Sequence, residues 1–211
     1  MDIFNEISEF LQKGKAKDVR ALVQQALDDN IAPQEILTEG LIVGMGIIGG
    51  KFKRNEVYVP EVLIAARAMN AGLEVLRPAL AKDNIKPIGK AVICTVKGDM
   101  HDIGKNLVKM MLEGQGIECI DLGVDVWADK IVEAIVEHKP DLVCLSALLT
   151  TTMMAQKEII DAIKEAGLRD KVKIMVGGAP VTQAFAEQIG ADAYTPDAAS
   201  AAETACIFLK E

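Results

Sequence analysis

The sequence predicts an α/β protein in which an N-terminal four-helix bundle precedes a five-stranded, parallel, doubly wound sheet of the flavodoxin-like kind. Up to about residue 81, apolar residues recur at intervals of three and four, as they do on one face of a helix. After residue 90, short continuous apolar runs alternate with helical patterns, which is typical of a parallel sheet buried on both faces. We therefore expect a helical-bundle domain at residues 1–82, a linker at 83–89 and a Rossmann-like domain at 90–211.

The first half of the chain contains four apolar stripes with helical spacing. Gly14 separates the first two stripes, and the third begins at Pro33, a residue type favoured in the first helical turn. A glycine-rich patch at 44–50 follows the third stripe. The connections are short and each segment has one apolar face, so an antiparallel four-helix bundle is the simplest arrangement. The stripes lie at residues 3–11, 19–27, 33–42 and 60–76.

The second half reads as five βα units. Such units imply a parallel sheet with helices on both faces. In the strand order 2-1-3-4-5, the first and third strands are neighbours at the point where the order reverses, which is where ligands bind in these sheets. The predicted strands are 91–96, 118–122, 141–149, 173–176 and 192–195, and the predicted helices are 103–113, 128–138, 152–166, 181–189 and 198–209.

Composition narrows the class of protein. The net charge of −8 and the absence of a Lys/Arg tract argue against nucleic acid as a partner. Apolar runs stop short of the roughly 20 residues that a bilayer requires, and Met1 opens onto an acidic amphipathic segment, so we expect a soluble cytoplasmic protein without a membrane partner. The four cysteines form no C-x-x-C pair and are expected to be core residues. With two histidines in the chain, a zinc site with several imidazoles is disfavoured.

The loop after the first predicted strand carries the most informative residues. Asp and His in such a loop often do no more than cap the next helix and meet solvent. A P-loop does not fit, because five residues separate Gly98 from Gly104 and Asn106 follows Lys105. An acidic divalent site would need a further carboxylate at the end of the third strand, where hydroxyls stand instead. The loop reads Lys97-Gly98-Asp99-Met100-His101-Asp102-Ile103-Gly104.

One imidazole with a carboxylate two residues away is the arrangement that orients a metal-bound histidine and raises its basicity. A hydroxyl at the end of the facing strand, from Thr152 or a neighbouring residue, could exchange a proton with that carboxylate. A single His ligand suits a metal that arrives already held by a macrocycle. The pair Gly177-Gly178 after the fourth strand would then let a large organic group approach the backbone, although an ordinary strand-to-helix turn is the better explanation of this pair taken alone.

These residues resemble a known family. The run from Gly98 to Asn106 resembles the Asp-x-His-x-x-Gly signature of cobalamin-binding domains, as found in methionine synthase and in the corrinoid methyl carriers of methanol, methylamine and aromatic O-methyl metabolism. Ser146-Ala147-Leu148-Leu149-Thr150 resembles the family's Ser-x-Leu-x-Thr element, and Gly177-Gly178 its Gly-Gly element. With the helical half included, the resemblance covers nearly the whole chain.

The resemblance implies that cobalamin or a related corrinoid binds in the base-off, His-on form. The benzimidazole base would leave the cobalt and enter a slot beside the sheet, and His101 would become the metal ligand from below. Asp99 would be its hydrogen-bond partner, and Thr152 stands where methionine synthase has a serine. The residues that would line this slot are Ser146, Gly177 and Gly178. The other implied cofactor-binding residues are Gly98, Met100, Asp102, Ile103, Gly104, Leu148 and Thr150.

The helical half matches the cap that family members place over the upper face of the corrin. Phe52 and Val59 fall at the positions whose apolar side chains shield the methyl group on cobalt, and the family often has Leu where Val59 stands. Without the resemblance, both are equally well explained as bundle core.

The resemblance implies a methyl carrier that is not catalytic by itself. It would accept a methyl group from a substrate-specific corrinoid methyltransferase and deliver it to a second methyltransferase, acting on coenzyme M or tetrahydrofolate. A homodimer is compatible with the sequence. Two alternatives share the cobalamin signature: the small subunit of an adenosylcobalamin-dependent mutase, which usually lacks a helical cap, and a cobalamin-sensing regulator, which would need a basic DNA-binding module.

Overall fold

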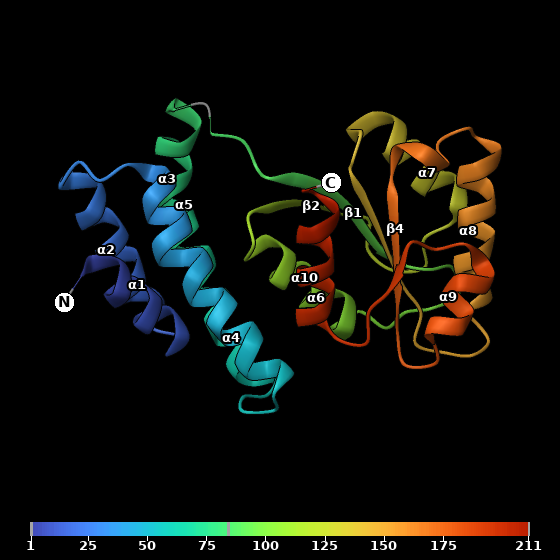
Figure 1. Ribbon diagram of the computed structural model, residues 1–211, viewed down its shortest axis with the longest axis horizontal. Helices are drawn as coiled ribbons and strands as arrows, with labels where there is room; N and C mark the ends of the chain where they lie inside the picture. The colour runs from blue at the N-terminus through green and yellow to red at the C-terminus, as the bar shows by residue number, and fades with distance from the viewer. Residues whose placement is uncertain (1, 84, 211) are drawn as a thin grey trace. The chain divides into compact units, whose positions relative to one another are not determined.

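The computed structural model describes residues 2–83 and 85–210, and contacts divide the chain into two compact units (Figure 1). The helical unit comprises Met1–Pro87 and Gly114–Gly116, and the sheet unit comprises Ile88–Glu113 and Ile117–Glu211. The predicted fold class is confirmed: helices form the first unit, and a five-stranded parallel sheet with flanking helices forms the second.

The helical unit contains four helical segments. The first begins at Asp2, whose carboxylate accepts a hydrogen bond from the Phe4 amide. It ends before Gly14, which adopts φ +68°, and a side chain at Gly14 would collide with Ile64. The four segments are α1 (Ile3–Gln12), α2 (Ala16–Asp28), a continuous third helix formed by α3 (Pro33–Glu35), η1 (Ile36–Ile42) and α4 (Val43–Lys53), and α5 (Val59–Lys82).

The third helical segment is longer than predicted. Its middle part, η1, is a π-helix, and the helix then continues through the glycine-rich patch to Lys53. Within the patch, Gly44 lies at a close contact with α1, since a Cβ there would come 3.1 Å from the Ser8 Cα. The absent side chain thus allows two helices to pack with their backbones near each other.

The sheet has the strand order β2-β1-β3-β4-β5 and every pairing is parallel, as the sequence predicts. Helices α6 and α10 pack together on one face, and α7, α8 and α9 cover the other (Figure 1). The strands are β1 (Gly89–Thr95), β2 (Ile117–Asp121), β3 (Leu142–Ser146), β4 (Lys173–Gly177) and β5 (Ala193–Tyr194). The helices are α6 (Ile103–Glu113), α7 (Ala128–His138), α8 (Met154–Glu165), the short 3-10 turn η2 (Arg169–Lys171), α9 (Gln183–Ile189) and α10 (Ala198–Phe208).

Strand β3 ends three residues earlier than predicted. The apolar run continues to Leu149, but the strand stops at Ser146, and the chain then turns away from the sheet. The amides of Leu148 and Leu149 donate hydrogen bonds to the side chain of Asp99 in the loop after β1. A side chain from a neighbouring strand end therefore replaces the ladder partners that a longer strand would have used.

Two further observations bear on the class of protein. Within the described part of the chain, no helix is both long and apolar enough to cross a bilayer. The four cysteines are free, and burial raises the pKa of Cys94 and Cys144 to about 12, so both thiols stay neutral at pH 7. Cys94 and Cys144 are core residues, as the sequence predicts.

Candidate functional site

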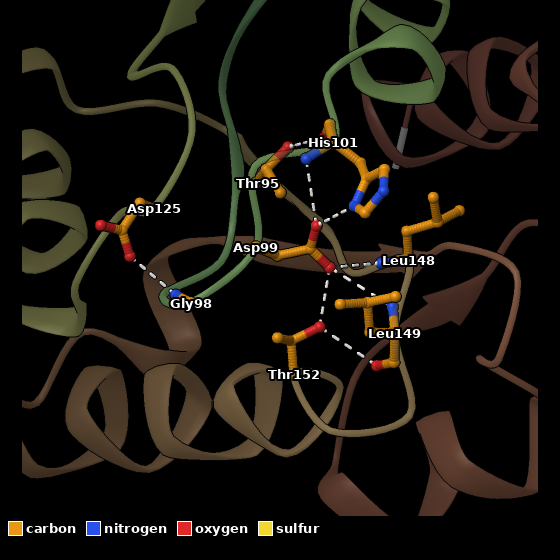
Figure 2. Close-up of polar contacts among 8 residues, drawn as sticks. All are labelled: Thr95, Gly98, Asp99, His101, Asp125, Leu148, Leu149 and Thr152. Atoms are coloured by element: carbon orange, nitrogen blue, oxygen red, sulfur yellow. Dashed lines mark hydrogen bonds and ion pairs between the residues drawn. The ribbon is translucent and has the colours of Figure 1, made fainter.

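The carboxylate of Asp99 is the centre of the candidate site (Figure 2). Its side chain is fully buried, at 0% exposed, in the loop that follows β1. Oδ1 accepts from the backbone amide of His101 at 3.1 Å and contacts the His101 ring Nδ1 at 2.7 Å. Oδ2 accepts from the Thr152 hydroxyl at 2.7 Å and from the amides of Leu148 at 2.7 Å and Leu149 at 3.3 Å. Every lone pair that a carboxylate offers is therefore used.

These hydrogen bonds determine the charge of Asp99. Burial alone would raise its pKa, but the bonds from Thr152, His101 and Leu148 outweigh burial and hold the pKa of Asp99 well below its usual value. An ionised carboxylate can only accept, so the His101 ring donates through Nδ1. In the neutral ring, the lone pair then resides on Nε2. The His101 side chain is 51% exposed, which leaves that nitrogen free to bind a metal.

The facing loop comes from β3 and α8, as the predicted strand order requires. Thr152 lies where the loop turns into α8, and its amide donates to the carbonyl of Leu149 at 3.1 Å. This turn aims the hydroxyl and the two loop amides at the same oxygen of Asp99. The structure thus brings Asp99, His101 and Thr152 into one hydrogen-bonded group, the three residues that sequence reasoning placed together.

On its other side, the His101 loop is held by a residue that sequence reasoning missed. Asp125 adopts φ +54° in the loop after β2, and its carboxylate accepts from the Gly98 amide at 2.7 Å. The Asp125 amide in turn donates to the Asp99 carbonyl at 3.0 Å. Figure 2 shows Asp125 and Leu148 on opposite sides of the loop. A polar residue after β2, at the same sheet edge, was the signal that could have indicated Asp125.

A second missed residue anchors the helix that follows the loop. The Lys105 side chain on α6 is 3% exposed, and its Nζ lies 2.6 and 2.7 Å from the two carboxylate oxygens of Asp121, the last residue of β2. Lys109 adds a second ammonium at 3.3 Å. A buried ion pair of this kind fixes geometry more than it adds stability. It holds the first turn of α6, and hence the end of the His101 loop, against β2.

Packing within the sheet unit leaves little room for a side chain at Gly177, the last residue of β4, and none at Gly178, which follows it. Gly178 adopts φ +125°, and a Cβ at this position would come 1.8 Å from the Ala147 carbonyl oxygen. A Cβ on Gly177 would come 3.3 Å from the Thr195 carbonyl oxygen. Ser146 pairs in register with Gly177, so these residues lie at one sheet edge with the His101 loop. Their role in lining a slot stays a prediction.

The remaining predicted residues of the sheet unit lie in or next to the His101 loop and the facing loop after β3. Met100, Ile103 and Leu148 are 69%, 75% and 42% exposed, so these two loops present large apolar side chains to solvent. Asp102 accepts a hydrogen bond from the Asn106 side chain on the first turn of α6. Gly104 and Thr150 are exposed in α6 and in the β3–α8 loop, respectively. Large exposed apolar side chains gathered in one place indicate a binding surface.

Phe52 and Val59 lie in the helical unit. Phe52 is in the last turn of α4, and Val59 is the first residue of α5. Between them a tight turn passes through Asn55 at φ +58° and carries the ion pair of Arg54 with Glu56. Both apolar side chains are partly exposed. Their contribution to a cofactor site stays a prediction.

The site offers one imidazole and no cage of ligands. Among residues 2–83 and 85–210, no three His, Cys, Asp or Glu side chains come together in a way that could hold a metal ion. A single imidazole, oriented by an ionised carboxylate in a loop that also carries exposed apolar residues, fits a metal that a planar macrocycle already holds and that takes one further ligand from the protein.

Comparisons with known proteins identify the family to which this chain is similar. Two family models, each described as a B12 binding domain, match residues 89–205 and 3–77. The chain is 41% identical to monomethylamine corrinoid protein 1 of Methanosarcina acetivorans over 99% of this chain and 98% of that protein. It is 42% identical to dimethylamine corrinoid protein 2 of the same organism over 95% of this chain and 93% of that protein.

Solved structures of cobalamin-binding proteins also resemble this chain. A chain of the methanol:cobalamin methyltransferase complex of Methanosarcina barkeri superposes with a TM-score of 0.88 at 32% identity, covering 99% of this chain and 80% of that one. A cobalamin-binding protein of Desulfitobacterium hafniense gives a TM-score of 0.82 at 31% identity, covering 99% of this chain and 98% of that one. The chain belongs to the B12-binding-domain family of corrinoid proteins.

Proposed function

We propose that this chain is a methyl carrier that holds a corrinoid through His101. One observation supports this most directly: the buried, ionised Asp99 fixes the His101 ring through Nδ1 and leaves Nε2 free at an exposed apolar edge. A histidine prepared in this way is a ligand for a single axial position of a metal. The similarity to corrinoid proteins along almost the full chain supports the same conclusion.

The residues fit a base-off, His-on corrinoid. When bound, the corrinoid supplies a cobalt centre that can accept and release a methyl group. His101 would be the lower axial ligand, the loop residues from Gly98 to Gly104 would face the ring, and Ser146, Gly177 and Gly178 would receive the nucleotide tail. Phe52 and Val59 of the helical unit would shield the upper face. Residues 83–89 would then serve as the linker between the two domains.

Within this site, Asp99 and Thr152 control the proton on the imidazole. The Thr152 hydroxyl donates to Asp99 Oδ2, while His101 donates to Oδ1, so the carboxylate is held ionised from both sides. A carboxylate held in this way strengthens the histidine as a donor to a metal. Because threonine has a restricted χ1, its hydroxyl stays directed at Asp99 rather than turning to solvent.

The carrier would serve two enzymes. One is a substrate-specific corrinoid methyltransferase, and the names of the relatives make methylamines the first donors to test. The other is a methyltransferase that passes the methyl group to coenzyme M or tetrahydrofolate. This exchange would take place in the cytoplasm, where the four free thiols would stay reduced. The carrier could act as a homodimer.

Reconstitution with hydroxocobalamin tests the proposal. The wild-type protein is expected to retain the corrinoid through gel filtration with the absorbance of an imidazole-ligated, base-off form. His101→Ala should lose that spectrum and bind at least about tenfold more weakly, roughly 1.4 kcal/mol. His138→Ala removes the chain's other histidine, on α7, and should behave as wild type.

Two results would contradict the proposal. A His101→Ala protein with an unchanged cobalamin spectrum would remove His101 as the axial ligand. Selective binding of adenosylcobalamin, together with failure to become methylated by a simple methyl donor after reduction, would favour a mutase subunit or a cobalamin sensor.

A further inference from the structure

Thr95 is a buried hydroxyl residue beside His101 that the proposed function does not yet use. It is the last residue of β1, and its side chain is fully buried. Its hydroxyl donates to the backbone carbonyl of His101 at 2.8 Å (Figure 2). The hydroxyl donates its one proton to the carbonyl of the proposed metal ligand, and this bond restricts the position of His101.

The position of the Thr95 hydroxyl is well defined. The Thr95 amide donates to the Gly123 carbonyl at 3.0 Å, and its own carbonyl accepts from the Val126 amide at 3.1 Å. Both partners belong to the segment that follows β2. The main chain of Thr95 is thus clamped on that side, and the β-branched side chain has few rotamers in a strand. The hydroxyl is a fixed point of the sheet.

The hydrogen bond from Thr95 restrains a part of His101 that the two bonds to Asp99 leave free to move. The amide and the ring Nδ1 of His101 both bind the same atom, Asp99 Oδ1. Two bonds to one oxygen leave the residue able to pivot about that oxygen. The bond from Thr95 holds the opposite end of the residue, the carbonyl, and removes that freedom.

The loop itself contributes little rigidity here. Residues 100–102 lie between β1 and α6 without regular secondary structure, and Met100 beside His101 is exposed. The contacts of Asp125 hold Gly98 and the Asp99 carbonyl, which lie upstream of His101. The Thr95 hydroxyl, in contrast, holds the carbonyl of His101 itself.

We infer that Thr95 is a positioning residue for His101, which sets the orientation of the imidazole through the His101 carbonyl. The inference rests on the proposed function, because the benefit of a fixed imidazole is ligation of the corrinoid. The hydrogen bond of the Thr95 hydroxyl goes to the main-chain carbonyl of His101 and not to the ring, so we expect Thr95 to act through the main chain. Its loss should loosen His101 without changing the charge of the site.

The test compares Thr95→Val with Thr95→Ser. Valine keeps the shape and β-branching but removes the hydroxyl, and serine keeps the hydroxyl. In protein labelled with 15N-histidine, loaded with hydroxocobalamin and reduced to the Co(II) state, the fraction showing 15N coupling in the EPR spectrum should fall roughly threefold or more in T95V, because the label separates His101 from the benzimidazole nitrogen of the cofactor. T95S should restore most of it. In the cofactor-free protein, the NMR amide signal of His101 should shift and broaden in T95V but not in T95S.

Thr38→Val is the matched control, because Thr38 also donates its hydroxyl to a backbone carbonyl, that of Gln34 at 3.0 Å in the helical unit. It should leave both spectra unchanged. Thr95→Ala provides a second variant without the hydroxyl, so a folding defect confined to T95V leaves the comparison intact.

A wild-type EPR signal in T95V, or an equal loss in T95V and T95S, would overturn the role of the hydroxyl while leaving the proposed function standing. Absence of nitrogen coupling in the wild-type protein would instead contradict the proposed function.

Discussion

Gly178→Ala is expected to destabilise the sheet unit by about 2–6 kcal/mol, because two costs add at this position. The backbone has φ +125°, where an alanine is strained by about 1–3 kcal/mol. The new Cβ would also come 1.8 Å from the Ala147 carbonyl oxygen, so the loop after β3 must move, at roughly 1–3 kcal/mol. Native domains are stable by about 5–15 kcal/mol, so the variant should be severely weakened.

Urea unfolding followed by the fluorescence of Trp127 measures this effect, since Trp127 is the one tryptophan of the chain and lies in the sheet unit. Gly167→Ala is the control. Gly167 also has a positive φ, of +69°, but a Cβ there meets no atom within 4 Å. It should therefore show only the backbone strain. Equal midpoints for the two variants would mean that the loop after β3 yields without cost and that Gly178 is not needed for close packing.

The fold could be predicted from the sequence because its signals are local. Continuous apolar runs between helical patterns define buried strands, and the handedness of βα units leaves few strand orders. The helices 103–113 and 128–138 were predicted with the bounds that the structure shows. The group of Asp99, His101 and Thr152 could be predicted for the same reason, since the carboxyl ends of neighbouring parallel strands meet at one edge.

The rest depends on contacts between segments that sequence patterns do not encode. The early end of β3 follows from the competition of the Asp99 carboxylate for the amides of Leu148 and Leu149, and an apolar run gives no sign of it. The contacts of Asp125 depend on the loop after β2 lying against the His101 loop, and the hydrogen bond of Thr95 depends on the His101 loop turning back toward the end of β1. The glycine-rich patch gives no sign that the third helical segment continues through it, or that Gly44 packs closely against α1.

Asp99→Asn should destabilise the sheet unit by roughly 2–4 kcal/mol at pH 7. The carboxylate accepts from donors on both of its oxygens. An amide replaces one oxygen with an NH₂ group, which must then face backbone amides or the Thr152 hydroxyl, and at least one buried donor loses its acceptor. Loss of the charge also weakens the bonds that remain, because hydrogen bonds to charged groups are stronger.

The difference between wild type and Asp99→Asn should depend on pH, with a sign that the pKa of Asp99 determines. The folded-state pKa of Asp99 is lowered, because the hydrogen bonds outweigh burial. An unfolded Asp has a pKa of about 3.9. The stabilisation is therefore fully present above about pH 4 and is lost as the pH falls toward the folded-state pKa. The advantage of the wild type over Asp99→Asn should be constant from pH 7 to about pH 5 and shrink below about pH 4.

Urea midpoints measured from pH 3 to pH 7 by Trp127 fluorescence check this dependence. Asp129→Asn is the control, because Asp129 is exposed and accepts only from the adjacent Lys130 amide. Its midpoint should follow that of the wild type at every pH. If the gap between wild type and Asp99→Asn stayed the same down to pH 3, the carboxylate would not be the charged acceptor that holds the two loops together. The orientation of His101 through Nδ1 would then need another cause, because it depends on Asp99 being ionised.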